Sequence, residues 1–127
     1  MNVKYFFGII ALLFFDTSLH AQTFVNTRQT LQTAINAAVP GSTIIVRNGT
    51  YNDFYASVSK LGTAENPITI KAETVGGVTL TGDSRFTMKK AAHIVFEGFV
   101  FDCTSSNTLI KLEACNNIRI TRNVFEL

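Results

Sequence analysis

The stretch HIVFEGFVFD, from His93 to Asp102, has a counterpart in NIRITRNVFE, from Asn117 to Glu126. The two stretches align without a gap at an offset of 24 residues, and an acidic residue closes each of them. The aligned apolar pairs are Ile94 with Ile118, Phe96 with Ile120, Val100 with Val124 and Phe101 with Phe125. A fixed period of this length, carried by short strands, is typical of a solenoid in which each period forms one coil. We therefore expect equivalent apolar side chains to point inward and to stack coil on coil.

The same period continues toward the N-terminus. Ile70 stands 24 residues before Ile94, and Ile44 lies about one coil earlier at a looser spacing. Short runs rich in β-branched and aromatic residues occupy residues 43–46, 68–72, 78–81, 94–101, 109–112 and 118–125. Similar strands are a whole period apart, with another strand between them, whereas an antiparallel sandwich would join neighbouring strands by hairpins. The sequence thus predicts an all-β chain folded as a parallel β-helix.

Residues 26–38 (NTRQTLQTAINAA) are the one segment with a helical period. Its apolar face consists of Leu31, Ala34, Ile35 and Ala38. Asn26 is the expected N-cap, with Gln29 three residues later as in a capping box, and Pro40 and Gly41 end the helix. We expect this short N-terminal helix to cap the first coil, whose strand edges would otherwise be open to pairing.

Residues 1–21 have the three parts of a secretory signal peptide. A positive start that includes Lys4 precedes an apolar run from Tyr5 to Phe15, and the small residue Ala21 marks the expected cleavage site. The run is shorter than the roughly 20 apolar residues that a membrane-spanning helix needs. An N-terminal membrane anchor is the alternative, because Leu19 stands where a small residue is usual. We expect a secreted or periplasmic protein without stable membrane insertion after cleavage.

The predicted mature domain, residues 22–127, shows no feature of a nucleic-acid-binding protein. The whole chain has 11 basic and 9 acidic residues and a net charge of +2, too weak a bias for such a partner. Cys103 and Cys115 could form a disulfide in an oxidising compartment, and two buried free thiols at turns are the alternative. Two cysteines and one histidine, His93, do not make a metal-ligating cluster in this domain.

Three segments resemble the N-terminal part of the family-6 polysaccharide lyases, the family of chondroitinase B and related alginate lyases. They are Leu31–Tyr51 (LQTAINAAVPGSTIIVRNGTY), Gly62–Ser84 (GTAENPITIKAETVGGVTLTGDS) and His93–Asp102. The most specific part is the block Glu65–Glu73 (ENPITIKAE), followed by Gly76, Gly77 and Val78. The resemblance covers nearly all of the predicted mature domain. It implies a right-handed β-helix that cleaves uronate-containing polysaccharides by β-elimination.

The resemblance also implies a calcium ion, held by Asn and Glu side chains, that stabilises the charge on the uronate carboxylate. A lysine of the family acts as base and an arginine assists as acid. All of these residues belong to later coils, so no catalytic or metal-binding residue is assigned here. We expect the chain to be an N-terminal fragment, truncated at its C-terminal end and inactive by itself. Alginate is slightly favoured over chondroitin or dermatan sulfate, because no dense basic cluster suggests sulfate recognition.

A few polar residues could still contribute to a site. His93 could act as a base, but a turn residue or ladder member is the stronger interpretation. Asp102 and Glu126 recur one period apart and could bind calcium, although polar turn residues of a solenoid explain them equally well. Lys71 and Glu97 should be outward neighbours, together with Thr121, and could form a cross-strand ion pair.

Two basic groups could hold a polyanionic sugar on the outside of the coils. They are Arg119 with Arg122, and Arg85 with Lys89 and Lys90. Solvated surface is the simpler interpretation of both groups. Asn116 and Asn117 most simply form a turn, since asparagine accepts left-handed backbone angles.

Two other functions remain open from the sequence. One is a different catalytic β-helix, such as a pectate lyase or a glycoside hydrolase, which would have a pair of acidic residues in later coils. The other is a secreted carbohydrate-binding or adhesion module with no catalytic group. A lyase of the resembling family would instead have a lysine and an arginine on successive coils near an Asn/Glu cluster.

Overall fold

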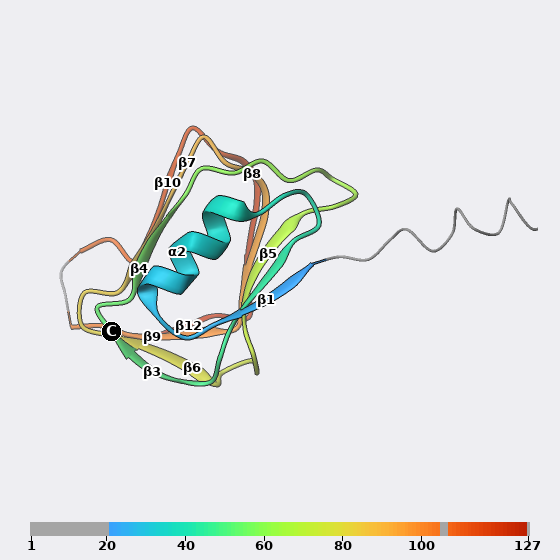
Figure 1. Ribbon diagram of the computed structural model, residues 1–127. Helices are drawn as coiled ribbons and strands as arrows, with labels where there is room; N and C mark the ends of the chain where they lie inside the picture. The colour runs from blue at the N-terminus through green and yellow to red at the C-terminus, as the bar shows by residue number, and fades with distance from the viewer. Residues whose placement is uncertain (1–20, 105–106, 127) are drawn as a thin grey trace, which may run out of the picture.

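Parallel strands from successive coils form three sheets around one core in this computed structural model, which describes residues 21–104 and 107–126 (Figure 1). Sheet A contains β1 (Gln22–Val25), β2 (Thr43–Val46), β5 (Ile68–Ala72), β8 (Ala92–Glu97) and β11 (Asn116–Thr121). Sheet B contains β3 (Gly49–Asn52), β6 (Val78–Thr81), β9 (Phe99–Asp102) and β12 (Val124–Glu126). Sheet C contains β4 (Tyr55–Val58), β7 (Arg85–Lys89) and β10 (Ile110–Glu113). The predicted parallel β-helix is confirmed.

The register of the last two coils is the one that the repeat predicts. Ile118 pairs with Ile94 and Ile120 with Phe96 between β11 and β8, and Phe125 pairs with Phe101 between β12 and β9. Ile94 and Phe96 are fully buried. The inward ladder is therefore confirmed, and pairing between similar strands one coil apart excludes the antiparallel sandwich.

The predicted pairing of Ile70 with Ile94 is wrong. Ile68 pairs with Ile94, and Ile70 pairs with Phe96. The first corner of this coil is longer, with 10 residues from Ile68 to Val78 against 5 from Ile94 to Phe99. The second corner is shorter, with 8 residues from Val78 to Phe86 against 11 from Phe99 to Ile110, so the coil is longer by two residues in all. A shift of two residues keeps every side chain on its face of the strand, since side chains alternate with a period of two. Ile70 therefore points inward as expected and is fully buried.

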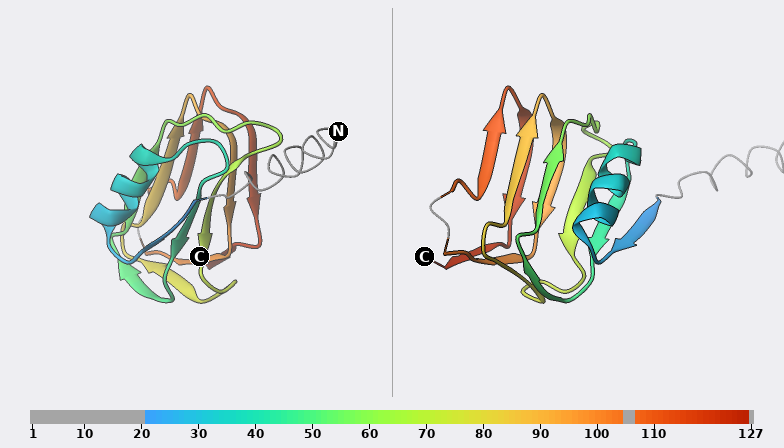
Figure 2. Two further views of the ribbon diagram at one scale, coloured as in Figure 1. Left: turned by 45° about the vertical axis from the view of Figure 1, so that its right-hand side comes forward. Right: turned by 60° about the vertical axis from the view of Figure 1, so that its left-hand side comes forward.

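Helix α2 (Arg28–Ala37) lies over the N-terminal end of the stack, opposite the last coil (Figure 2). Leu31 and Ile35 are buried on its inner face, as the helical period predicts. The expected N-cap is wrong by one residue, because Thr27, and not Asn26, has the extended backbone and accepts the hydrogen bond of the cap. Thr30 completes the capping box in place of Gln29.

Aromatic rings from all three sheets meet in the centre of the coils. Phe86 of β7, Phe96 of β8, and Phe99 and Phe101 of β9 are fully buried. The ring centroids of Phe86 and Phe96 are 4.6 Å apart, and those of Phe96 and Phe99 are 4.5 Å apart. Such pairs contribute about 0.5–1.5 kcal/mol each beyond the burial of their area. Because the inward side chains fill this core, a binding site can only be formed by the outward side chains of the strands.

The predicted signal peptide, residues 1–21, lies outside the described residues except for Ala21. Within residues 21–104 and 107–126, no helix is long and apolar enough to cross a membrane.

Candidate functional site

His93 lies in strand β8 with a left-handed backbone conformation. It follows the first residue of β8 with φ of 54°, and Asn117, its counterpart one coil later, has φ of 53°. Its carbonyl oxygen lies so near Gly62 that a Cβ at Gly62 would approach it to 2.5 Å. Asn117 has the left-handed angle that the sequence suggests, but the predicted turn is wrong, because Asn116 and Asn117 lie in β11 and His93 lies in β8.

Asp102 and Glu126 are neighbours in register at the ends of β9 and β12. No group of three or more His, Cys, Asp or Glu side chains that could hold a metal ion occurs among the described residues. We assign no described residue as a ligand of the calcium ion that the family resemblance implies. The two carboxylates are polar residues at a corner of the solenoid.

Lys71, Glu97 and Thr121 form one outward column on sheet A, as the sequence predicts. The predicted ion pair is wrong, since no contact within 4.0 Å joins Lys71 to Glu97 in the part of the chain that the structure describes. Register places the two Cα atoms opposite each other, but the ends of two long exposed side chains remain free to separate.

The two predicted basic groups lie on different surfaces. Arg119 is on the outer face of sheet A, and Arg122 is at the corner between β11 and β12. Arg85 and Lys89 point outward from β7 in sheet C, whereas Lys90 is a left-handed corner residue. The Lys89 ammonium pairs with Glu113 at 3.1 Å. The Arg85 guanidinium lies over the ring of Tyr55.

Tyr55 is the centre of the most chemically distinctive cluster on sheet C. The guanidinium carbon of Arg28 lies 4.1 Å from the centroid of its ring, and that of Arg85 lies 4.6 Å from it. Arg28 comes from the first turn of α2, and Tyr55 and Arg85 are register neighbours on β4 and β7. We call these three residues the Tyr55 cluster.

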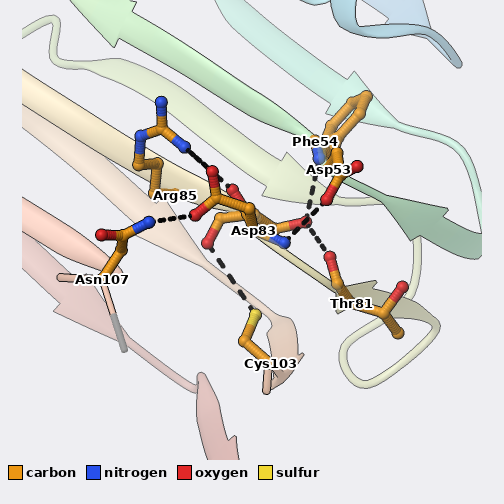
Figure 3. Close-up of polar contacts among 8 residues, drawn as sticks. Asp53, Phe54, Thr81, Asp83, Arg85, Cys103 and Asn107 are labelled. Atoms are coloured by element: carbon orange, nitrogen blue, oxygen red, sulfur yellow. Dashed lines mark hydrogen bonds and ion pairs between the residues drawn. The ribbon is translucent and has the colours of Figure 1, made fainter. Parts of the chain in front are cut away.

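A hydrogen-bonded corner between β6 and β7 supports Arg85 (Figure 3). The Arg85 guanidinium pairs with the Asp83 carboxylate and donates to the Asp83 carbonyl oxygen at 3.2 Å. The Asp83 backbone N–H donates to Asp53 at 2.8 Å, and the Asn107 amide donates to the Asp83 carboxylate. The buried Ser84 hydroxyl donates to the Thr81 carbonyl oxygen at 2.6 Å. Arg85 is thus held in place by neighbouring coils.

Cys103 and Cys115 are free, half-buried thiols at the two ends of the segment that contains β10. The Cys103 thiol donates to the Leu80 carbonyl oxygen at 3.4 Å, and the Cys115 thiol donates to that of Met88 at 3.2 Å. Burial raises the pKa of Cys103, which disfavours the reactive thiolate. The two thiols therefore link successive coils through their hydrogen bonds.

The sequence does not reveal the Tyr55 cluster as a whole. Arg85 belongs to a predicted basic group, but Arg28 and Tyr55 carry no signal in the 24-residue repeat. Arg28 approaches β4 only because α2 packs across the end of the coils, and no local pattern reports that packing. A basic residue on the polar side of the capping helix is the one available hint.

Comparison with known proteins places the fold in a family. A sequence model described as Chondroitinase B matches residues 25–126. The PL6 family alginate lyase AlyGC is 30% identical, with a TM-score of 0.72 over 83% of this chain and 15% of its own chain. A PL6 family polysaccharide lyase from Pseudopedobacter saltans is 27% identical, with a TM-score of 0.69 over 81% of this chain and 24% of its own. No curated protein matches significantly. The chain therefore belongs to the chondroitinase B family and shares the β-solenoid of the PL6 polysaccharide lyases.

Proposed function

We propose that the chain is the N-terminal part of an exported polysaccharide lyase that cleaves uronate-containing polysaccharide by β-elimination, with alginate as the favoured substrate. The observation that carries the proposal is the family match over residues 25–126. The similarity to an alginate lyase at 30% identity supports the preference for alginate. The chain spans 15% and 24% of the length of the two lyases, so it represents a small part of such an enzyme.

In this reaction a base removes the proton from C5 of the uronate, and the bond from C4 to the glycosidic oxygen breaks. A double bond forms between C4 and C5, and the leaving oxygen takes up a proton. We propose that the base, the acid and any calcium ligands belong to coils outside this chain. The small share of the lyases that the chain covers supports this.

The activity is tested with the purified chain and with a longer protein that continues the coils. The new double bond absorbs ultraviolet light, so product formation is followed directly with alginate, chondroitin sulfate and polygalacturonate. We expect no product from the chain alone and product from alginate with the longer protein. Product from the chain alone would overturn the proposal that the catalytic residues lie outside this chain. Activity of the longer protein on polygalacturonate alone would overturn the proposed substrate.

Export is tested separately by expression of the whole chain in a bacterial host. We expect the chain in the periplasm or medium, with Gln22 as its first residue, because the residues that end at Ala21 have the features of a signal peptide. The mass of the purified protein reports the cleavage site. A full-length mass in the membrane fraction would support the alternative of an N-terminal anchor.

A further inference from the structure

A groove of about 400 Å³ runs between helix α2 and strand β4, beside the Tyr55 cluster. Its lining residues are Arg28, Gln29, Gln32, Tyr55, Ala56 and Ser57. The groove lies on the outside of sheet C at the N-terminal end of the coils, so the aromatic core does not fill it.

Arg28 gives the groove a positive charge that no neighbour neutralises. Its guanidinium has no hydrogen bond or ion pair within the described parts of the chain, and it lies over the ring of Tyr55. Arg85, in contrast, is paired with Asp83. The first turn of α2 contains no acidic residue, so the partial positive charge of the helix N-terminus adds to that of Arg28.

The walls of the groove are held in place before any ligand arrives. The Gln32 side chain donates to the carbonyl oxygen of Ser57 and accepts from the N–H of Ser57, both at 2.9 Å. This pair of hydrogen bonds joins α2 to the edge of β4. The contacts of Arg28 and Arg85 with the Tyr55 ring fix the other wall. A preformed site binds without the cost of ordering its side chains.

The chemistry of the groove matches a carboxylate attached to a hydroxyl-rich ring. A planar guanidinium can donate two parallel hydrogen bonds to a carboxylate, which gives geometric selectivity as well as affinity. In the described structure the Gln29 amide and the Tyr55 hydroxyl have no protein partner, and they can pair with sugar hydroxyls. One unpaired cation and no lining lysine suit a singly charged sugar better than a sulfated one.

We propose that this groove binds a uronate residue of an acidic polysaccharide, as an accessory site outside the coils that carry out the elimination. The inference rests on the proposed function for the kind of polymer, but the site itself needs no lyase activity. Arg28 holds the carboxylate, Tyr55 and Arg85 position Arg28, and Gln29 contacts the sugar hydroxyls.

The test measures binding of alginate oligosaccharides to the whole chain by calorimetry. Arg28→Gln should weaken binding at least about tenfold, the loss expected for one charge-assisted pair. Arg28→Lys should give an intermediate loss, because the charge remains and the paired geometry does not. Arg119→Gln removes the same kind of charge from the outer face of sheet A and should leave binding unchanged. Thermal unfolding of each variant confirms that the fold is retained.

The outcomes separate this site from the lyase proposal. Equal losses in the Arg28 and Arg119 variants, no loss in Arg28→Gln, or equal binding of neutral dextran would overturn the site. Tighter binding of chondroitin sulfate than of alginate would overturn the preference for an unsulfated sugar. Arginine-dependent alginate binding by this chain, with no lyase activity in the longer protein, would support the site while overturning the proposed function.

Discussion

His93 and Asn117 show how a single backbone conformation repeats along the solenoid. Both residues have left-handed angles at equivalent positions of β8 and β11, and Lys90 and Ala114 repeat the pattern at the preceding corner. Left-handed angles cost a residue with a Cβ about 1–2 kcal/mol, and least for asparagine. The repeat thus keeps the same backbone conformation and tolerates different side chains there.

Substitutions at His93 distinguish a backbone role from a chemical one. His93→Asn should leave stability unchanged or slightly higher, whereas His93→Val should lower the free energy of unfolding by about 1–2 kcal/mol, because a β-branched side chain clashes in this conformation. Urea unfolding measures both. Equal losses in the two variants would show that the imidazole itself contributes the stability.

Glu113 of sheet C is a carboxylate whose pKa is lowered by two neighbouring lysines. Its oxygens lie 3.1 Å from the Lys89 ammonium and 3.8 Å from that of Lys111. The hydrogen bond and charge of Lys89, and to a smaller extent the charge of Lys111, lower the pKa of Glu113. Because the pKa is lower in the folded state, the ion pair stabilises the fold above the unfolded pKa, and this contribution is lost as the pH falls through the folded pKa.

Lys89→Met should therefore raise the pKa of Glu113 toward its ordinary value, as a carboxyl NMR titration would show. Lys111→Met is the matched control and should produce a smaller rise, because its ammonium is farther away. A larger rise in the Lys111 variant would mean that the ranking of the two lysines is wrong.

Among the elements, α2 protects the N-terminal edges of the coils in two ways. Its apolar face covers the open end of the core through Leu31 and Ile35. Its polar Gln32 side chain forms hydrogen bonds with the backbone N–H and carbonyl oxygen of Ser57, on the exposed edge of β4. The unpaired backbone groups of an edge strand can bind strands of other chains. Helix α2 opposes such association because it covers the core and forms hydrogen bonds with the edge strand.

The capping box of α2 makes a prediction at this scale. Thr27→Ala should lower the free energy of unfolding by about 1 kcal/mol, since the Thr27 side chain accepts from the Thr30 N–H at 3.0 Å. Asn26→Ala should have little effect, because Asn26 is outside the cap. Thermal or chemical unfolding measures both. A larger loss in the Asn26 variant would favour the cap that the sequence pattern predicts.

At the opposite end of the molecule, the last coil presents apolar side chains to solvent. Leu112, Ile120 and Phe125 are 47%, 39% and 46% exposed, although they continue the buried ladders of Met88, Phe96 and Phe101. The strands β10, β11 and β12 are the last in their sheets. A coil buries its apolar side only against a neighbour. Further coils of a longer protein would cover this surface and improve its solubility.

We expect the chain by itself to associate through this end. The variant that combines Leu112→Glu with Ile120→Lys should remain monomeric at concentrations where the unaltered chain forms larger species. Leu61→Glu with Val75→Lys is the matched control, since both residues are exposed apolar loop positions away from the last coil. Size-exclusion chromatography over a range of concentrations measures this. A monodisperse unaltered chain would refute the expectation.

The amino-acid sequence by itself determined the parallel solenoid, the inward ladder of Ile94 and Ile118, and the apolar face of α2. These features follow from periods of 24, two and 3.6 residues, which are local properties of the chain. Tertiary structure decided the pairing of Ile68 with Ile94. The lengths of the corners set this register, and the corner residues do not follow the repeat in the sequence. Tertiary structure also decided the Tyr55 cluster, since Arg28 and Tyr55 meet only where a helix packs across a coil. Contacts between elements depend on packing that no single segment encodes.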